Sequence, residues 1–253
     1  MKLLRQSPLS ARIGMGIVLL NVLVAIFAPL IAPYGETNVV GDVWENFSPH
    51  FYFGTDHIGR DLFTRMVFGA RNTIGLAFIT TILSFSFGSL MGFIAAVKGG
   101  WTDQVLSRII DILMAFPTLI FALMILSVLG SSITTLIFTI AILDSTRVYR
   151  LSRAVAMDIE VMEYVEAARL RGEGLWWIIR QEILPNAMPP LIAEFGLRFC
   201  FVFLFVASLS FLGLGLQPPL SDWGGMVREN AGAITFGIYI PLIPAGAIAF
   251  LTV

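Results

Sequence analysis

Long apolar runs alternate with shorter polar segments along the chain. Predominantly apolar residues cover positions 13–31, 73–97, 112–143, 191–216 and 233–253. A helix of about 20 apolar residues crosses a bilayer, whose hydrocarbon core is about 30 Å thick. The run 112–143 would form a helix of about 48 Å, too long for one crossing, so we expect it to divide at Gly130-Ser131-Ser132. The pattern predicts an all-α polytopic membrane protein with six transmembrane helices.

Polar segments between these runs carry their own helical and turn signals. Residues 33–71 are polar and turn-rich, and residues 98–108 form a short charged link. In the charged segment 144–188 the spacing predicts a helix from Glu160 to Leu170, a break at Gly172 and Gly174, and a second helix from Leu175 to Ile183. Leu184-Pro185-Asn186 is expected to end that second helix. The segment therefore predicts a helix–bend–helix unit.

Composition supports a membrane protein and excludes several other classes. The chain is 57% hydrophobic and 13% charged, which lies outside the usual soluble range. A net charge of -1 gives no reason to expect nucleic-acid binding. Cys200 is the single cysteine, and His50 and His57 have no partners at metal-ligand spacing. We expect no metal, no bound cofactor and no redox chemistry.

The distribution of basic residues predicts the orientation. With a cytoplasmic N-terminus, the inner side collects Lys2, Arg5, Arg12, Lys98, Arg108, Arg147, Arg150, Arg153, Arg169, Arg171 and Arg180. The outer side keeps only Arg60, Arg65, Arg71 and Arg228. Basic residues near span ends favour the cytoplasm, so the helix–bend–helix unit is expected there. The first apolar run is too long for a signal-peptide core, and we interpret it as a retained span.

The stretch FGTDHIGRDLFTRMVFGAR, residues 53–71, precedes the second expected span. Thr55-Asp56 and Gly59 can form a turn, and Asp61 can cap a short helix. That helix would carry Arg65 on a different face from its apolar residues, as at a membrane interface. A metal or catalytic site at Asp56, His57 and Asp61 is the less favoured alternative, because no further ligand group lies close by in the sequence.

The stretch LSFLGLGLQPPLSDWGGM, residues 209–226, closes the fifth expected span. Gly213 and Gly215 loosen the helix end, and Pro218-Pro219 prevent its continuation. Trp223 is expected to anchor at the membrane interface. The glycine pair lacks the Lys-Ser/Thr of a phosphate-binding loop.

Charged residues at the edges of the apolar runs can pair with one another. Glu194 and Arg198 are four residues apart, so they can pair on one helix face. Asp111 follows Arg108, and Asp144 lies near Arg147. We expect all of them near cytoplasmic span ends, in structural pairs, with a gating role as the alternative. The absence of a charge at a span centre argues against a proton-coupled carrier.

Two interpretations of the cytoplasmic unit follow from the residues alone. It could lie on the bilayer as an amphipathic loop. Alternatively, Ala167-Ala168 beside Glu166 leave a low surface on which another protein can dock.

Several motifs resemble those of the permeases of ATP-binding-cassette (ABC) importers. Glu166-Ala167-Ala168, Gly172 and Leu184-Pro185 match the family's EAA–G–LP signature. The dipeptide/oligopeptide/nickel branch is similar at two further elements, GTD-x-x-GRD-x-x-x-R and LGLG-x-QPP…WG. These comprise Gly54, Thr55, Asp56, Gly59, Arg60 and Asp61, and then Gly213, Gly215, Gln217, Pro218, Pro219, Trp223 and Gly224. The chain departs from that branch at Glu182, where histidine is usual, and at 143–150, LDSTRVYR.

The resemblance implies a type I ABC importer permease fold with a cytoplasmic coupling helix in a loop at about 158–188. Its coupling residues would be Glu163, Glu166, Ala167, Ala168, Arg169, Gly172, Leu184 and Pro185. It implies a tail, first span and extracytoplasmic segment over 1–71 and a core permease domain over 72–253, with a C-terminal piece expected beyond Val253.

The resemblance also implies a bacterial inner-membrane subunit that is not itself an enzyme. It would form the path for peptides or similar small solutes, in contact with membrane lipid. A second homologous permease, two ATPase subunits and an extracytoplasmic binding protein would be its partners, with ATP and Mg on the ATPases. The chain carries no G-x-x-x-x-G-K-S/T motif of its own. An ATP-independent secondary transporter or channel is the alternative, and an intramembrane enzyme is a further one.

Overall fold

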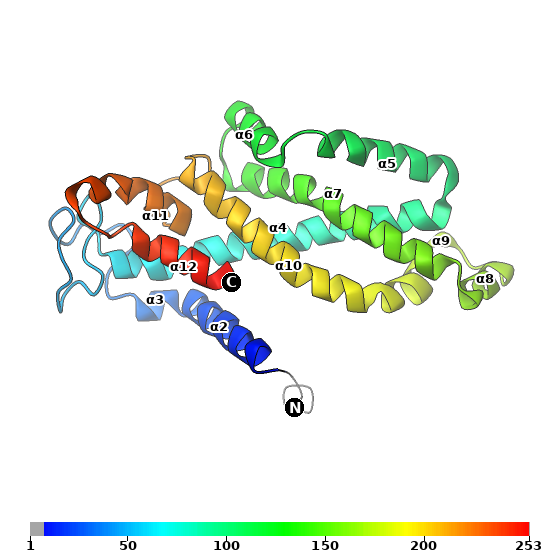
Figure 1. The fold of residues 1–253 in the computed structure, drawn as a ribbon, viewed down its shortest axis with the longest axis horizontal. Helices are drawn as coiled ribbons and strands as arrows, with labels where there is room; N and C mark the ends of the chain where they lie inside the picture. The colour runs from blue at the N-terminus through cyan, green and yellow to red at the C-terminus, as the bar shows by residue number, and fades with distance from the viewer. Residues whose placement is uncertain (1–7, 253) are drawn as a thin grey trace. The chain divides into compact units, whose positions relative to one another are not determined.

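The computed structural model describes residues 8–252. Its regular secondary structure is helical apart from two isolated β-bridges, and loops connect the helices (Figure 1). Lys2 and Arg5, which we assigned to the cytoplasmic side, lie outside the described residues. The chain falls into two compact units. The first draws on the described parts of 1–77, 131–133 and 203–253, and the second on 78–130 and 134–202.

The first unit contains both ends of the described chain. Its helices are α2 (Leu9–Ile26), α3 (Ala28–Ile31), the start of α4 (Leu62–Lys98), the end of α10 (Leu184–Phe211), α11 (Trp223–Asn230), the 3₁₀-helix η2 (Ala231–Phe236) and α12 (Leu242–Thr252). A loop between α3 and α4 carries the two bridges, Val39 with Arg60 and Thr55 with Asp61.

The second unit contains the middle of the chain. Its helices are the rest of α4, then α5 (Gly100–Met114), α6 (Thr118–Leu129), α7 (Ile133–Glu160), α8 (Glu163–Leu170), α9 (Leu175–Trp177), the π-helix η1 (Ile178–Ile183) and the start of α10. The predicted break at Gly130 is confirmed, because α6 ends at Leu129 and α7 begins at Ile133.

Two helices of the described chain are long and apolar enough to cross a membrane: α4 and the continuous helix Leu175–Phe211. A third candidate is the pair α5 and α6, which meet at an angle of 86°. Residues 11–26 and α12 are shorter apolar helices. The all-helical prediction is confirmed, whereas the count of six spans stays a prediction.

The third predicted span is interrupted at an unexpected place. Residues 98–108, predicted as a charged link, include the first turns of α5, which continues to Met114. The chain then breaks before Pro117, the N-cap of α6. Proline lacks an N–H and forces the residue before it out of the helical region, which explains a break inside an apolar run.

The fourth and sixth predicted spans also differ from the structure. α7 continues through the charged residues to Glu160, so the predicted helix from Glu160 to Leu170 is reduced to α8. The run predicted from Ala233 begins with the 3₁₀-helix η2, which stops at Gly237 with a φ of 72°. The α-helix of that run begins only at Leu242.

Two predicted helix boundaries are wrong. The short helix after Asp61 and the second span are one helix, α4. Leu184-Pro185-Asn186 does not end a helix, because the chain passes from η1 into α10, which also contains Pro189 and Pro190. The amide of Leu184 bonds the carbonyl of Ile179, five residues back. Such a wide π-turn just before Pro185 gives room for a ring that would clash in a regular helix.

Candidate functional site

The helix–bend–helix unit is formed by α8, a glycine turn and α9, as predicted. After α8, the amide of Gly172 donates to the carbonyl of Arg169, and the amide of Glu173 donates to the carbonyl of Ala168. These two bonds form the Schellman motif, which requires a left-handed residue after the helix. Gly172 supplies that conformation with a φ of 81°. The bend is therefore encoded at Gly172, whereas Gly174 is extended and begins α9.

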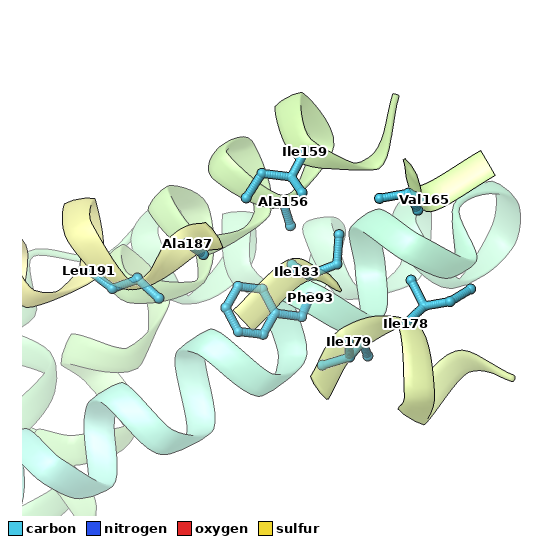
Figure 2. Packing of buried hydrophobic residues seen from close by; sticks show 9 residues of the cluster. All are labelled: Phe93, Ala156, Ile159, Val165, Ile178, Ile179, Ile183, Ala187 and Leu191. Carbon is cyan, nitrogen blue, oxygen red and sulfur yellow. The ribbon is translucent and has the colours of Figure 1, made fainter. Parts of the chain in front are cut away.

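One face of the unit is fixed to the ends of three long helices. Val165 of α8 is fully buried. Three isoleucines of η1 are also buried, namely Ile178, Ile179 and Ile183. They pack in one cluster with Phe93 of α4, Ala156 and Ile159 of α7, and Ala187 and Leu191 of α10 (Figure 2). Val165 therefore connects α8 to α4, α7 and α10 through one buried cluster.

Arg169 strengthens this attachment with polar contacts. Its Nη2 lies 2.5 Å from Oε1 of Glu160, the last residue of α7. The same atom donates to the carbonyl of Val97 near the end of α4, at 3.2 Å. Arg169 thus joins α8 to α7 and α4. We had predicted instead that Arg169 would contact a docked partner.

The predicted coupling residues divide between the two faces of the unit. Glu163, Glu166, Ala167, Leu184 and Pro185 are exposed. Ala168 is completely buried. The prediction that Ala167 and Ala168 together form a low docking surface is therefore wrong for Ala168, whose small side chain lets α8 pack closely on its own protein. Only Ala167 presents a small side chain outward.

Sequence reasoning missed the apolar part of the exposed face. Leu170 is 84% exposed, Val161 75% and Trp176 61%. Exposed large apolar residues on a charged surface are a typical mark of a protein interface. The signal was available in the sequence, as apolar residues at both ends of a short charged helix.

Three residues of the 53–71 stretch form a buried charge cluster with Glu229 of α11. This cluster, here called the Asp56 cluster, consists of Asp56, Arg60, Arg65 and Glu229. Oδ2 of Asp56 lies 2.7 Å from Nε of Arg60 and 2.6 Å from Nη1 of Arg65. Oε2 of Glu229 lies 2.8 Å from Nη1 of Arg65 and 3.3 Å from Nη2 of Arg60. The cluster ties the loop and α4 to α11. Arg65 is 1% exposed, so its predicted place at the membrane interface is wrong.

Local hydrogen bonds in this stretch match the prediction. Oδ1 of Asp56 accepts from the amides of Ile58 and Arg60, both at 2.9 Å, and forms the expected turn. Oδ2 of Asp61 accepts from the amide of Thr64 and caps α4. Thr55 is buried and donates to the carbonyl of Asp42.

The electrostatics of the Asp56 cluster stabilise an ionised carboxylate. Burial alone would raise the pKa of Asp56. The backbone hydrogen bonds from Arg60 and Ile58, together with the charges of Arg65 and Arg60, outweigh burial and hold the pKa below its ordinary value.

A further ligand group, Glu229, does come close to Asp56 and His57, contrary to the sequence argument. Ligand atoms of Asp56, His57 and Glu229 lie within 4.8 Å of one another. However, the carboxylate oxygens of Asp56 and Glu229 already accept from two guanidinium groups. A cation would have to displace both arginines, so the donor set does not fit a metal ion.

The 209–226 stretch closes α10 and packs α11 against it. Nε2 of Gln217 donates to the carbonyls of Gly213 and Gly215, both at 3.1 Å, before the Pro218-Pro219 pair. Trp223 is 3% exposed and donates from Nε1 to the carbonyl of Met66 at 2.9 Å, so its predicted role as an interface anchor is wrong. Gly224 allows the close approach, because a Cβ there would lie 2.2 Å from the carbonyl oxygen of Ala207.

A second charge cluster, here called the Asp144 cluster, joins Ser84, Asp144, Glu194 and Arg198. Nε of Arg198 lies 2.7 Å from Oε1 of Glu194, which confirms the predicted pair. Nη1 of Arg198 lies 3.6 Å from Oδ1 of Asp144, and Oγ of Ser84 donates to Oδ2 of Asp144 at 2.7 Å. Ser84 lies near the middle of the apolar run 73–97, and the prediction that no charge sits at a span centre stays a prediction.

The other predicted edge charge also finds a different partner. Oδ1 of Asp111 lies 2.7 Å from Nη2 of Arg150 instead of pairing with Arg108, and both partners are about half exposed. Arg153 pairs with Asp103. These pairs join α5 to α7.

Comparison with known proteins identifies the family. The model of the "Binding-protein-dependent transport system inner membrane component" family matches residues 88–253. The "N-terminal TM domain of oligopeptide transport permease C" matches residues 3–49. The dipeptide transport system permease protein DppC of Alkalihalophilus pseudofirmus is 37% identical over 94% of this chain and 79% of its own length. The glutathione transport system permease protein GsiD of Escherichia coli is 35% identical over 93% of this chain and 78% of its own length.

A solved structure supports the same fold. The MetNI methionine ABC transporter, in an inward-facing conformation, superposes with a TM-score of 0.61. The match covers 74% of this chain and 89% of that chain at 19% identity, and it therefore shows the fold alone.

The chain belongs to the family of binding-protein-dependent transport system inner-membrane components. It is a multi-pass membrane permease subunit of a bacterial ABC importer, in which partner ATPase subunits carry out the hydrolysis of ATP. An ATP-independent transporter or channel is excluded by this membership.

Proposed function

We propose that the chain forms half of a translocation pathway for di- or oligopeptides and is coupled to an ATPase through α8. The observation that carries the proposal is the division of α8 into two faces. Val165 and Ala168 are buried against the chain itself, whereas Glu163, Glu166 and Ala167 are exposed. A short helix fixed on one side and open on the other is suited to receive force from a docked partner.

The coupling mechanism follows from these contacts. An ATPase subunit binds the exposed face, which includes Glu166, Leu170 and Trp176. Closure of the ATPase dimer on ATP displaces α8, and the buried cluster around Val165 passes the displacement to α4, α7 and α10 (Figure 2). The pathway opens outward, and hydrolysis resets it.

The substrate class rests on the relatives. One of the similar permeases serves dipeptide transport and another serves glutathione transport, as their names state. Both solutes are short peptides. A soluble binding protein outside the membrane delivers the peptide, and the chain itself holds neither ATP nor Mg.

The proposed topology has six crossings with the N-terminus in the cytoplasm. They are α2 with α3, α4, α5 with α6, α7, α10 and α12. This topology puts α8 beside the ATPases and the Asp56 cluster beside the binding protein. A second, homologous permease completes the pathway as a heterodimer.

The test is uptake of labelled alanyl-alanine by proteoliposomes that contain the complete complex. We expect uptake to require ATP and the binding protein. Glu166→Lys reverses the charge on the exposed face of α8 and is expected to leave the chain in the membrane, with ATP hydrolysis continuing and uptake reduced at least about tenfold, as for loss of a docking contact worth about 1.4 kcal/mol.

The matched control is Asp158→Lys, the same change of charge at an exposed acid of α7 just before α8. It is expected to keep uptake. Wild-type uptake by Glu166→Lys contradicts the coupling role of α8, and equal loss in both variants shows an effect of charge without docking.

A further inference from the structure

A groove of about 420 Å³ lies within the first unit, just before α12 begins. Residues 45–47, from the loop between α3 and α4, form one wall. Residues from the segment 237–243 form the other wall. The lining is mostly apolar, and Phe47 and Tyr239 belong to it.

Both walls are fixed by their own contacts. The amide of Glu45 donates to Oγ1 of Thr55 at 2.7 Å, and its carbonyl accepts from the amide of Thr55 at 3.1 Å. In the other wall, the amide of Ile238 donates to the carbonyl of Ala233 at 3.1 Å, and Ile240 is buried. A partner that enters the groove therefore finds a prepared surface and does not have to order it.

The groove carries aromatic rings that the described chain leaves uncovered. Phe47 and Tyr239 are each 69% exposed. Phe236, beside the groove, is 72% exposed, although its ring lies 5.7 Å from that of Trp44. Exposed apolar patches around a groove mark interaction sites, and aromatic side chains contribute most of the binding energy at many interfaces.

The charge around the groove is negative. The two stretches that contain its walls, 13–59 and 229–253, have no lysine or arginine. Asp42 lies beside Glu45, whose Oε2 accepts from the amide of Asp42 at 3.3 Å. Neither carboxylate forms an ion pair with a described residue, whereas Asp56 of the same loop is paired with Arg60 and Arg65. The complementary surface is therefore apolar at its centre and basic around it.

These features fit a protein better than lipid. Under the proposed topology the groove lies outside the sixth crossing, which begins at Leu242. The irregular backbone of the loop cannot face hydrocarbon, where its polar groups would have no partners. Anionic lipid headgroups would be repelled by Asp42 and Glu45.

We propose that this groove is a docking site for the extracytoplasmic binding protein, which places an apolar side chain between Phe47 and Tyr239 and basic residues near Asp42 and Glu45. The family takes its name from its dependence on such a protein. The inference rests on the proposed function, whose topology puts the groove on the outer side of the membrane.

The experiment measures the Kd of the importer's own binding protein, labelled with fluorescein, for the complete complex in nanodiscs by fluorescence anisotropy. Phe47→Ala and Tyr239→Ala are each expected to raise the Kd about 10- to 30-fold, as for an aromatic residue at the centre of an interface. Tyr239→Phe keeps the ring and is expected to stay within about twofold of the wild type.

The matched control is Tyr52→Ala, at a 63% exposed aromatic residue of the same loop that does not line the groove. It is expected to change the Kd by less than about twofold. An unchanged Kd in both Phe47→Ala and Tyr239→Ala, or an equal loss in Tyr52→Ala, overturns the inference alone. Failure of the wild-type complex to bind the protein at all contradicts the proposed function, and the inference with it.

The charge of the partner is tested by association rates. Asp42→Asn combined with Glu45→Gln is expected to slow association about threefold to tenfold at low salt, with no difference at about 0.5 M salt, where the charges are screened. Faster association of this double variant would show an acidic partner surface and overturn the inference.

A bimane label at Phe47→Cys, in a complex without other reactive cysteines, reports what covers the groove. We expect the emission of a water-exposed label in the complex alone and a blue shift when the binding protein is added. Quenching by doxyl-labelled lipid before that addition assigns the groove to the membrane. Blue-shifted emission without such quenching assigns it to another subunit, and either result overturns the inference.

Discussion

Gly172 is the residue on which the shape of the helix–bend–helix unit depends most directly. Its φ of 81° costs about 1–2 kcal/mol for a residue with a Cβ. A Cβ there would meet no atom within 4 Å, so the cost is conformational only. We expect Gly172→Ala to reduce the population of the bent unit about 5- to 30-fold, and ATP-driven peptide uptake to fall with it.

Two companion variants separate this effect from a general one. Gly172→Asn is expected to retain more uptake than Gly172→Ala, because asparagine tolerates the left-handed region. Gly174→Ser is expected to match the wild type, because Gly174 has a φ of -81° and serine is a good helix N-cap. Full uptake by Gly172→Ala would show that the Schellman turn is not needed for coupling.

Asp56 gives a pH dependence whose sign can be worked out. Its folded-state pKa is lowered, so its contribution to stability is present above the ordinary aspartate pKa of about 3.9. That contribution is lost as the pH falls through the lower, folded value. We expect hydrogen exchange of residues 54–60, corrected for intrinsic rates, to be constant from pH 7 to 5 and to accelerate only below about pH 4. Acceleration between pH 7 and 5 would contradict the assignment of this stability to the Asp56 carboxylate.

At this scale, the sequence predicted the local contacts and missed the distant ones. The cap at Asp61 and the turn at Gly172 depend on neighbours within a few residues, so their patterns could be recognised. The pair of Arg65 with Glu229 joins residues 164 positions apart, and that of Arg198 with Asp144 joins separate helices. No periodicity carries such information, so the burial of Arg65 and the contact of Arg198 with Asp144 were both missed, although the local pair of Arg198 with Glu194 was predicted.

At the scale of elements, Val165 is the large apolar residue that attaches α8 to the buried cluster, so we expect one substitution there to loosen α8. Val165 is the residue that α8 contributes to the buried cluster in Figure 2, and its side chain is fully buried. Val165→Ala removes about two methylene equivalents, worth about 1–2 kcal/mol. We expect faster hydrogen exchange of residues 163–170 in the variant, with the exchange of α4 unchanged. Val105→Ala, the same change at an exposed residue of α5, is the control. Equal exchange in Val165→Ala and wild type would contradict the docking of α8 through this face.

The element-level predictions succeeded in the all-helical class and in the break at Gly130, and they failed at prolines. Pro117 interrupts an apolar run, whereas Pro185, Pro189 and Pro190 lie within a continuous helical stretch. The difference lies in the turn that precedes each proline, since η1 widens the helix just before Pro185. Residue type alone does not specify that widening, so the end of the second cytoplasmic helix was predicted wrongly.

For the whole molecule, we expect the proposed coupling to depend on helices that contribute to both units. α4 is continuous from Leu62 to Lys98, although its residues up to Ala77 belong to the first unit and those from Phe78 belong to the second. Arg169 contacts the carbonyl of Val97 near the C-terminal end of α4. Arg65 of the Asp56 cluster lies near the N-terminal end of the same helix. Under the proposed function, we expect α4 to transmit a displacement at α8 along its length, so its continuity should be required for coupling.

Gly75 offers a test of that requirement, because a Cβ there would meet no atom within 4 Å and its helix crosses the unit boundary two residues later. Gly75→Pro costs the helix a hydrogen bond and about 2 kcal/mol relative to glycine, and it introduces a kink. Gly75→Ala strengthens the helix by about 1 kcal/mol. We expect the ratio of peptide uptake to ATP hydrolysis to fall in Gly75→Pro and to hold or rise in Gly75→Ala. If the proline variant kept the wild-type ratio at equal membrane levels, transmission would have to run through α7 or α10 instead.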